Sequence, residues 1–358
     1  MHRTKMHGKT ILIKNIANTI QNSANCIPEE EGKGEENMAK KMTATAPVVQ
    51  RSVKKLSTWQ MMKQYKILLL MCLPAMIFFF IFSYIPLPGV YIAFTNFKYN
   101  LGIWHSQFVG FKNFEFLFRT GEIWKLTRNT VLYNLAFILL GNLLQIFIAI
   151  LLNEIMSYGF KKITQSMMFL PHFISDVLVG LLVYNLFNAD YGFINSVIRS
   201  FGGEGMNVYS NPNAWPWLLP LINLWKTTGY GSVVYFAAIC GIDSEIVEAA
   251  KVDGANAFQK IRYIILPQLK GTVIILLLFA VGGILKGNFG MFYNIIGKNS
   301  VLYDTTDIIE TFVYRSLMTN FNFQNASAVG LYQSIFGFAI VMLCNKIVKK
   351  IDPDYSLF

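Results

Sequence analysis

Charged side chains are scarce in this sequence. They make up 14% of its 358 residues, whereas a soluble globular domain carries about 25%. Hydrophobic residues account for 54%, with 30 phenylalanines among them, and they are gathered into long runs. Long apolar runs separated by short polar stretches indicate membrane-spanning helices rather than the core of a soluble domain.

The sequence also lacks the patterns of metal, nucleotide and catalytic sites. Its four cysteines include no Cys-x-x-Cys pair, so neither a zinc site nor a disulfide framework is indicated. No Gly-x-x-x-x-Gly-Lys-Ser/Thr phosphate loop occurs, and no Ser-His-Asp set or suitably spaced carboxylate pair is present. We therefore expect a chain that is not an enzyme, binds no metal or cofactor and does not itself hydrolyse ATP.

The sequence has a net charge of +11, and its charged residues lie mainly between the apolar runs. This placement favours the basic loops of a membrane protein over nucleic-acid binding. Residues 1–55 are polar and of mixed charge, so we expect a disordered N-terminal tail. No apolar run precedes residue 67, which argues against a signal peptide. Met38 and Met42 are possible alternative starts, and residues 56–358 are expected to form one transmembrane domain.

Six apolar runs follow the tail, and each approaches the roughly 20 residues needed to cross a bilayer. They cover residues 67–85, 129–152, 163–187, 215–240, 269–285 and 330–348. The fifth run is expected to continue through Lys286-Gly287. Backbone groups cannot be left unpaired in lipid, so the spans must be helical. Pro74, Pro171 and Pro220 predict kinks or local breaks. The fold class is therefore an all-α integral membrane protein with about six transmembrane helices.

The distribution of Lys and Arg predicts the orientation. With both termini in the cytoplasm, the inner segments (47–66, 153–162, 241–268 and 346–358) hold 13 basic residues in 71 positions. The outer segments (86–128, 188–214 and 286–329) then hold 9 in 114. Because basic residues concentrate on the cytoplasmic side, we expect both termini to be cytoplasmic.

The predicted inner loop 241–268 has the pattern of a short helix, a turn and a second helix. Asp243 or Ser244 can cap the first helix, and Glu248 is an acidic residue of that helix. Gly254 can adopt a left-handed turn without steric cost. Pro267 punctuates the approach to the next span. The two consecutive alanines that follow Glu248 leave a narrow surface that another protein can approach closely.

This loop resembles the EAA motif of ABC importer permeases, whose pattern is Glu-Ala-Ala, three residues, Gly, nine residues and Ile-x-Leu-Pro. The matching positions, together with the acidic residue before the glycine, are Glu248, Ala249, Ala250, Asp253, Gly254, Ile264, Leu266 and Pro267. The resemblance implies a coupling helix that sits in a groove of a separate ATPase subunit. Glu248 would pair with polar or basic groups of the ATPase, the alanines would pack in the groove, and Gly254 would shape the turn.

The resemblance extends over roughly residues 65–358 and is similar to the carbohydrate-uptake branch, in particular to polysaccharide or lipoprotein-type sugar permeases related to maltose-type importers. The stretches that carry it are 109–114 (VGFKNF), 128–130 (RNT), 169–173 (FLPHF), 225–227 (WKT), 304–314 and 345–350. It implies a type I ABC importer permease of the bacterial cytoplasmic membrane that imports a sugar, most simply an oligosaccharide. The implied partners are a second homologous permease, an ATPase dimer and an extracellular solute-binding lipoprotein, besides membrane lipid.

Two opposite charges interrupt the apolar runs at similar depth. Asp176 and Lys226 lie roughly 20 Å and 21 Å from the cytoplasmic ends of their runs at 1.5 Å per residue. Charges inside spans are costly and are usually paired or functional. The two residues could form a neutralising pair between helices, or they could line the substrate path. Trp225 and Tyr230 could stack on sugar rings in that path, or could pack against other helices. His172 is interpreted as a polar residue at a helix break rather than a metal ligand.

Two other classes of protein compete with the importer interpretation. A secondary transporter or channel would need ion-relay carboxylates or inverted repeats, and Asp176 is the only acidic residue deep in a predicted span. A membrane-embedded enzyme would need a catalytic constellation. The loop 241–268 favours the importer over both.

Overall fold

The computed structural model describes residue 63 and residues 65–351. The predicted tail 1–55 lies outside these residues. The chain divides into two compact units, residues 1–73 and 74–358, and the boundary falls inside the first described helix, α3. In the described part of the first unit, residues 66–73 form the beginning of α3. All that follows on packing concerns the second unit.

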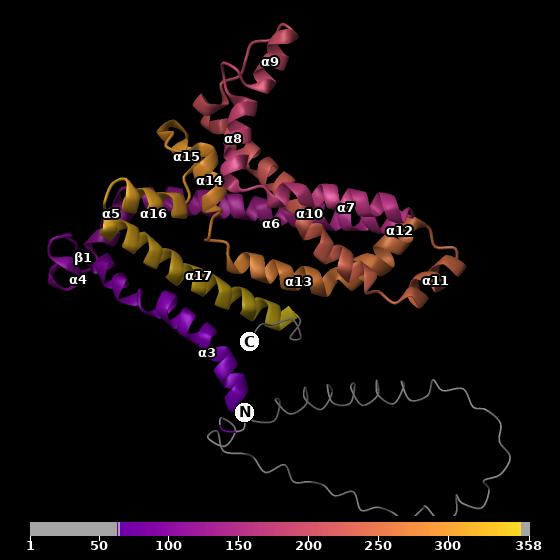
Figure 1. Ribbon diagram of the computed structural model, residues 1–358, viewed down its shortest axis with the longest axis horizontal. Coiled ribbons are helices and arrows are strands. Elements are labelled where there is room, and N and C mark those ends of the chain that lie inside the picture. Colours follow the sequence, from indigo (N-terminus) through magenta and orange to yellow (C-terminus); the bar gives the residue numbers. More distant parts are fainter. Residues whose placement is uncertain (1–62, 64, 352–358) are drawn as a thin grey trace, which may run out of the picture. The chain divides into compact units, whose positions relative to one another are not determined.

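The described residues are overwhelmingly helical (Figure 1). The α-helices are α3 (Lys66–Phe79), α4 (Gly102–His105), α5 (Lys112–Arg119), α6 (Glu122–Glu154), α7 (Tyr158–Phe173), α8 (Asp176–Phe187), α9 (Phe193–Ser200), α10 (Trp215–Cys240), α11 (Ser244–Val252), α12 (Ala257–Lys260), α13 (Leu266–Gly282), α14 (Phe289–Ile296), α15 (Tyr303–Thr306), α16 (Ile309–Met318) and α17 (Phe323–Ile351). The π-helical segments are η1 (Phe80–Tyr84) and η5 (Ile261–Ile265). The 3₁₀ segments are η2 (Leu87–Phe94), η3 (Val208–Ser210), η4 (Pro212–Ala214) and η6 (Ser300–Leu302). Strands β1 (Thr95–Asn96) and β2 (Gln107–Phe108) form a short antiparallel pair.

Each of the six predicted apolar runs is largely helical, and four stretches of the described residues are long and apolar enough to cross a membrane. These are Lys66–Phe94, Glu122–Glu154, Ala257–Gly282 and Phe323–Lys350. The helices α7 and α8 add a fifth if the bent pair counts as one span. Helix α10 has 26 residues but is not among these apolar stretches. The count of six spans stays a prediction, as does the orientation of the termini.

The third run, 163–187, contains a local break close to Pro171, as predicted. Helices α7 and α8 meet at an angle of 94°. Ile174 and Ser175 have extended backbone conformations, and the Ser175 hydroxyl accepts a hydrogen bond from the amide of Leu178 at 3.4 Å. Pro171 lies one turn before the break, where its missing amide weakens the helix. A serine that caps a new helix thus turns a continuous apolar run into two elements.

The fifth run ends earlier than predicted. Helix α13 stops at Gly282, and the amide of Gly283 bonds to the carbonyl of Ala280 at 3.0 Å in a tight turn. Two consecutive glycines favour such an end because they lose the most conformational freedom inside a helix. At the other two prolines no break occurs, since α3 and α10 continue through Pro74 and Pro220.

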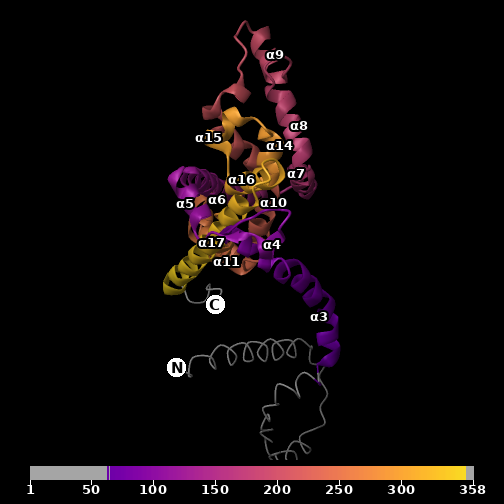
Figure 2. The same cartoon turned by 90° about the vertical axis from the view of Figure 1, so that its left-hand side faces the viewer.

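Three buried clusters hold the second unit together. The first lies where α8, α10 and α14 meet, around Val179, Trp215 and Phe292. The second joins α6 to the C-terminal helices α16 and α17, and the third joins α6, α10 and the start of α13. Figures 1 and 2 show α14 beside α8 in both views, in line with the packing of these two helices.

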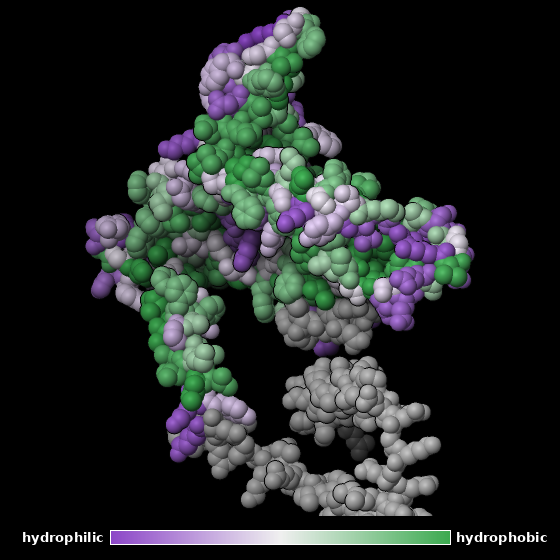
Figure 3. All heavy atoms as spheres, turned by 45° about the vertical axis from the view of Figure 1, so that its right-hand side comes forward, coloured by the Kyte–Doolittle hydropathy of each residue, from purple (hydrophilic) through white to green (hydrophobic). Residues whose placement is uncertain are grey.

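Large apolar side chains cover the outside of the long helices (Figure 3). On α6, Leu132, Leu143 and Phe147 are each more than half exposed. Water would make such a surface unfavourable, at about 25 cal/mol for each Å² of apolar area, whereas lipid or a partner subunit would not. The exposed apolar faces therefore agree with helices made for a bilayer.

Candidate functional site

The loop 241–268 has the helix–turn–helix form that its sequence predicts. The Asp243 carboxylate, rather than Ser244, caps α11 by accepting a hydrogen bond from the amide of Glu245 at 3.0 Å. Gly254 has a φ of +77°, which confirms the predicted left-handed turn. The amide of Ala255 bonds back to the carbonyl of Ala250 at 2.9 Å, so the turn closes the end of α11. The residues therefore fix this loop locally, before any partner is present.

The second half of the loop shows features that the sequence interpretation missed. Asn256 and Gln259 form a reciprocal capping box at the start of α12, with both hydrogen bonds at 2.8 Å. The signal was present as Asn-x-x-Gln, a known helix start. The π-helical η5 then leads directly into Leu266-Pro267 at the start of α13. Pro267 therefore lies in the first turn of α13, where a missing amide costs little.

The loop 241–268 exposes apolar side chains that nothing in the described chain covers. Val252 is 87% exposed, Phe258 70% and Tyr263 70%. Among the predicted coupling residues, Glu248, Ala249, Asp253, Gly254, Leu266 and Pro267 are exposed, whereas Ala250 and Ile264 are half-buried. A contact with another protein would cover such exposed apolar groups.

A salt bridge ties this loop to the end of α6. The Lys260 ammonium lies 2.7 Å from Oε1 of Glu154, and the two side chains are 15% and 35% exposed. A depression of ≈ 250 Å³ lies beside it, with Glu248 and Lys251 among its lining residues. The two partners are separated by 106 residues, so their pairing could not be predicted from the sequence. The loop is thus attached to α6 as well as to its own spans, α10 and α13.

The predicted charge pair is confirmed. The Lys226 ammonium on α10 donates to the Asp176 carboxylate at the start of α8, and the side chains are 12% and 29% exposed. Asp176 does not lie inside a continuous helix, because the chain breaks at Ile174 and Ser175 just before it. Asp176 instead occupies the first turn of α8, where the helix dipole favours an acidic residue. A Cβ atom at Gly290 of α14 would collide with this carboxylate, so three helices meet at the pair.

The predicted aromatic residues have different surroundings. Tyr230 stacks on His172, with ring centroids 4.2 Å apart and planes within 8°, and it is 52% exposed. His172 therefore packs against an aromatic ring near the helix break, and among the described residues its buried Nδ1 has no hydrogen-bond partner. Trp225 precedes Lys226 and is 45% exposed. The exposed rings are available to a ligand or to a partner subunit.

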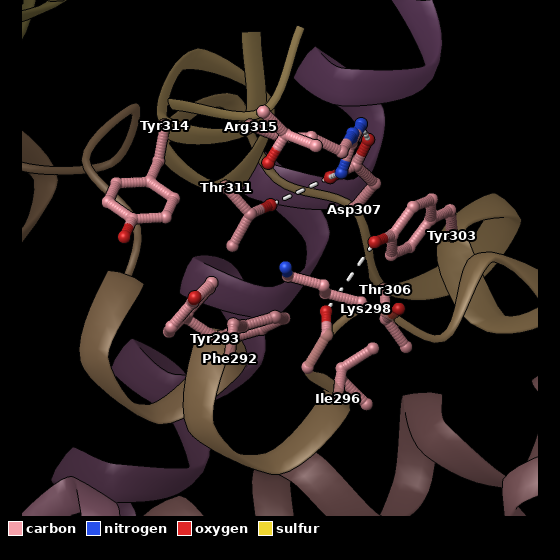
Figure 4. Close-up of a pocket in the computed structure, with 12 residues that line it drawn as sticks. Phe292, Tyr293, Ile296, Lys298, Tyr303, Thr306, Asp307, Thr311, Tyr314 and Arg315 are labelled. Atoms are coloured by element: carbon pink, nitrogen blue, oxygen red, sulfur yellow. Dashed lines mark hydrogen bonds and ion pairs between the residues drawn. The ribbon is translucent and has the colours of Figure 1, made fainter. Parts of the chain in front are cut away.

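A cavity of ≈ 170 Å³ lies among α14, α15 and α16 (Figure 4), and sequence reasoning did not find it. Asp307 and Arg315 form a salt bridge at its wall, and the Arg315 guanidinium lies 4.2 Å from the centre of the Tyr303 ring. Burial lowers the pKa of Arg315, but its hydrogen bond to Asp307 and the charge of that residue raise it more, so the net shift is upward. This arginine therefore stays charged and in place.

Comparison with known proteins identifies the class to which this arrangement belongs. Residues 141–352 match the family described as the binding-protein-dependent transport system inner membrane component. Protein LplB of Bacillus subtilis is 34% identical over 86% of this chain and 96% of its own length. The polygalacturonan/rhamnogalacturonan transport system permease protein YteP of the same organism is 35% identical over 81% and 90%.

A solved structure agrees with these relatives. A chain of a bacterial ABC transporter involved in the import of the acidic polysaccharide alginate superimposes with a TM-score of 0.74 and 30% identity, over 82% of this chain and 99% of that one. A chain of a bacterial alginate ABC transporter in complex with an alginate pentasaccharide-bound periplasmic protein also superimposes with a TM-score of 0.74 and 30% identity.

The chain therefore belongs to the family of binding-protein-dependent transport system inner membrane components. It has the type I ABC importer permease fold and is a multi-pass protein of the bacterial cytoplasmic membrane. Its activity is transport rather than catalysis, and the family implies a separate ATPase subunit and a binding protein as partners.

Proposed function

We propose that this permease joins a second homologous permease to import an oligosaccharide that contains acidic sugar units. An extracellular solute-binding lipoprotein would deliver the oligosaccharide, and an ATPase dimer would drive its import. The acidic class is supported by the relatives, one named for polygalacturonan and rhamnogalacturonan and another for alginate. The need for a second permease is supported by the small number of spans, since the described residues hold four apolar spans and one bent pair.

The observation that carries the coupling role is the exposed apolar surface of the loop 241–268. The backbone amides at the starts of its two helices already have hydrogen-bond partners within the loop, because Asp243 caps α11 and Asn256 caps α12. The apolar side chains of Val252, Phe258 and Tyr263 therefore need cover from another protein. The loop connects directly to α10 and α13, so a force applied to it reaches two spans. We place Glu248, Ala249, Ala250, Asp253 and Gly254 in the contact with the ATPase.

The substrate path is proposed to pass the Asp176–Lys226 pair. The two side chains are partly exposed, and the exposed rings of Trp225 and Tyr230 lie on the same helix as Lys226. A salt bridge between partly exposed groups can be exchanged for contacts with a polar ligand at little net cost. A secondary transporter or channel could use the same pair, but neither would need the exposed apolar loop.

Two variants test the coupling role: one removes apolar contact area from the loop and the other adds a bulky side chain to it. Phe258→Ser removes apolar contact area, which is worth about 1.5–3 kcal/mol when fully buried. Ala249→Trp adds bulk to a narrow surface. We expect both variants to insert normally, to retain the partner permease and to lose most of the ATPase on affinity purification, together with uptake in proteoliposomes.

The control is Phe201→Ser, because Phe201 is 87% exposed on the segment that follows α9 and lies far from the loop in sequence. This variant should keep its ATPase. If Phe258→Ser and Ala249→Trp retain the ATPase and transport at the native rate, the loop is only a connection between helices, and the channel or secondary transporter returns as the better interpretation.

A further inference from the structure

The cavity among α14, α15 and α16 lies beyond the end of α13 that is remote from the coupling loop. Helix α13 begins at Leu266 in that loop and runs for 17 residues, or roughly 25 Å at 1.5 Å per residue. The chain then turns into α14, whose residues Phe292, Tyr293 and Ile296 form one wall of the cavity. If the loop 241–268 faces the ATPase, the cavity belongs to the outer half of the protein, where a ligand arrives.

The charges of the cavity leave one cation unbalanced. Among its lining residues, Asp307 is the acid, and Arg315 and Lys298 are the bases. Arg315 pairs with Asp307 through two hydrogen bonds, and the Thr311 hydroxyl donates to the same carboxylate at 2.7 Å. Lys298 is exposed and takes part in no salt bridge with residues 65–351. Figure 4 shows its ammonium group pointing into the space between Thr311 and Tyr293. The cavity therefore carries a net positive charge.

The remaining lining is aromatic and rigid. Tyr293, Tyr303 and Tyr314 all contribute to it. The Tyr314 ring lies 4.9 Å from the Tyr293 ring, and Tyr303 is covered by the Arg315 guanidinium. These contacts hold the rings in place without using all their surface. Flat, amphipathic rings with a few polar groups suit a ligand that has both apolar faces and hydroxyl groups, as a sugar does.

We propose that this cavity is a subsite for one acidic sugar unit of the incoming oligosaccharide, in which the Lys298 ammonium binds the carboxylate and the tyrosines contact the sugar ring. This inference rests on the proposed function, because it supplies the contact that selects an acidic substrate. The volume of ≈ 170 Å³ is smaller than the roughly 300–1,000 Å³ of a pocket that holds a whole drug-sized ligand, so it suits one unit and not a whole chain. A flexible lysine binds as a point charge and holds its ligand less rigidly than a bidentate arginine, as a transfer step requires.

The test uses the assembled importer in proteoliposomes with its binding protein and ATPase. Trimers of galacturonate and of alginate serve as probes, and two quantities are measured: the uptake rate at saturating loaded binding protein, and the half-saturating concentration of that protein for ATP hydrolysis. Lys298→Gln removes the charge, Lys298→Arg keeps it, and Lys112→Gln removes another exposed lysine, from α5. We expect Lys298→Gln to lower acidic-trimer uptake roughly two- to five-fold, the range of an exposed ion pair. Lys298→Arg and Lys112→Gln should stay near native uptake, and the half-saturating concentration should not change.

Three results would overturn the subsite. Lys298→Gln could transport at the native rate, Lys298→Arg could be as impaired as Lys298→Gln, or the loss could appear in the half-saturating concentration, which would make Lys298 a docking residue for the binding protein. A native importer that takes up neither acidic trimer would refute the proposed substrate class itself, and the subsite with it. Native uptake combined with an unaffected Lys298→Gln would refute the subsite alone.

Discussion

The Asp176–Lys226 pair shows how two costly residues can make each other acceptable. Each charge alone would be expensive within a bundle of apolar helices, and removal of one partner strands the other. The structure pairs them and places Asp176 at the positive end of α8. The pair therefore holds the start of α8, just after the break between α7 and α8, against α10. At the same point, Gly290 lets α14 come close to the Asp176 carboxylate.

A double-mutant cycle tests this role. We expect Asp176→Asn and Lys226→Gln each to lower the stability of the detergent-solubilised protein by about 1–3 kcal/mol, less than for a fully buried pair because both side chains are partly exposed. The double variant should recover part of that loss. The measurement is thermal unfolding of the purified chain, with Lys270→Gln on α13 as a single-lysine control. Strictly additive losses would mean that the two side chains do not depend on each other.

Two contacts at this scale could not have been predicted from the sequence. The stacking of His172 on Tyr230 and the collision that a Cβ at Gly290 would cause both depend on how helices cross. The pairing of Asp176 with Lys226 was predictable for a different reason. Opposite charges are so rare inside apolar runs that two of them at similar depth have few other partners.

At the scale of the elements, the sequence predicts the local turns and caps, and it predicts the break near Pro171 but not the unbroken helices at Pro74 and Pro220. The turn at Gly254 and the cap at Asp243 depend on neighbours within a few residues, so their patterns predict them. The break between α7 and α8 lies inside an apolar run, and the two signals for it, Pro171 and Ser175, are also common in continuous membrane helices. Only packing of α8 against α14 decides that the chain turns there.

Close helix crossings depend on glycines that face a neighbouring backbone. A Cβ at Gly229 of α10 would collide with the carbonyl of Met168 on α7, and one at Gly180 of α8 with the carbonyl of Asn294 on α14. Alanine at either site has to push two backbones apart, and we expect a loss of about 1–3 kcal/mol in thermal unfolding.

The matched control for these crossings is Gly330→Ala on α17, where a Cβ atom meets nothing within 4 Å. Because alanine is the better helix former, this variant should be neutral or more stable by up to about 1 kcal/mol. Equal effects at all three glycines would show that the two crossings are looser than the structure indicates.

At the scale of the whole molecule, the loop 241–268, to which we assign the coupling role, is attached to more than its own two spans. It is attached to α6 through the Lys260–Glu154 salt bridge, and α6 packs along α10 for much of its length. The cavity around Lys298 lies at the other end of α13. A displacement of the loop by the ATPase therefore has a direct route through α6, α10 and α13 to the helices that surround the proposed substrate path.

This arrangement predicts that loss of the salt bridge uncouples transport without unfolding the protein. An exposed ion pair contributes only about 0–1 kcal/mol to stability, so Lys260→Gln and Glu154→Gln should unfold near the native temperature and keep the ATPase bound. The loop would, however, no longer pull on α6 when the ATPase closes. We expect each variant to hydrolyse ATP at a near-native rate while the number of oligosaccharides imported per ATP falls several-fold. The exchanged pair, Glu154→Lys with Lys260→Glu, should restore part of the ratio, whereas Lys162→Gln on α7 should leave it unchanged. A native ratio in both single variants would show that α6 takes no part in coupling and that the force passes through α10 and α13 alone.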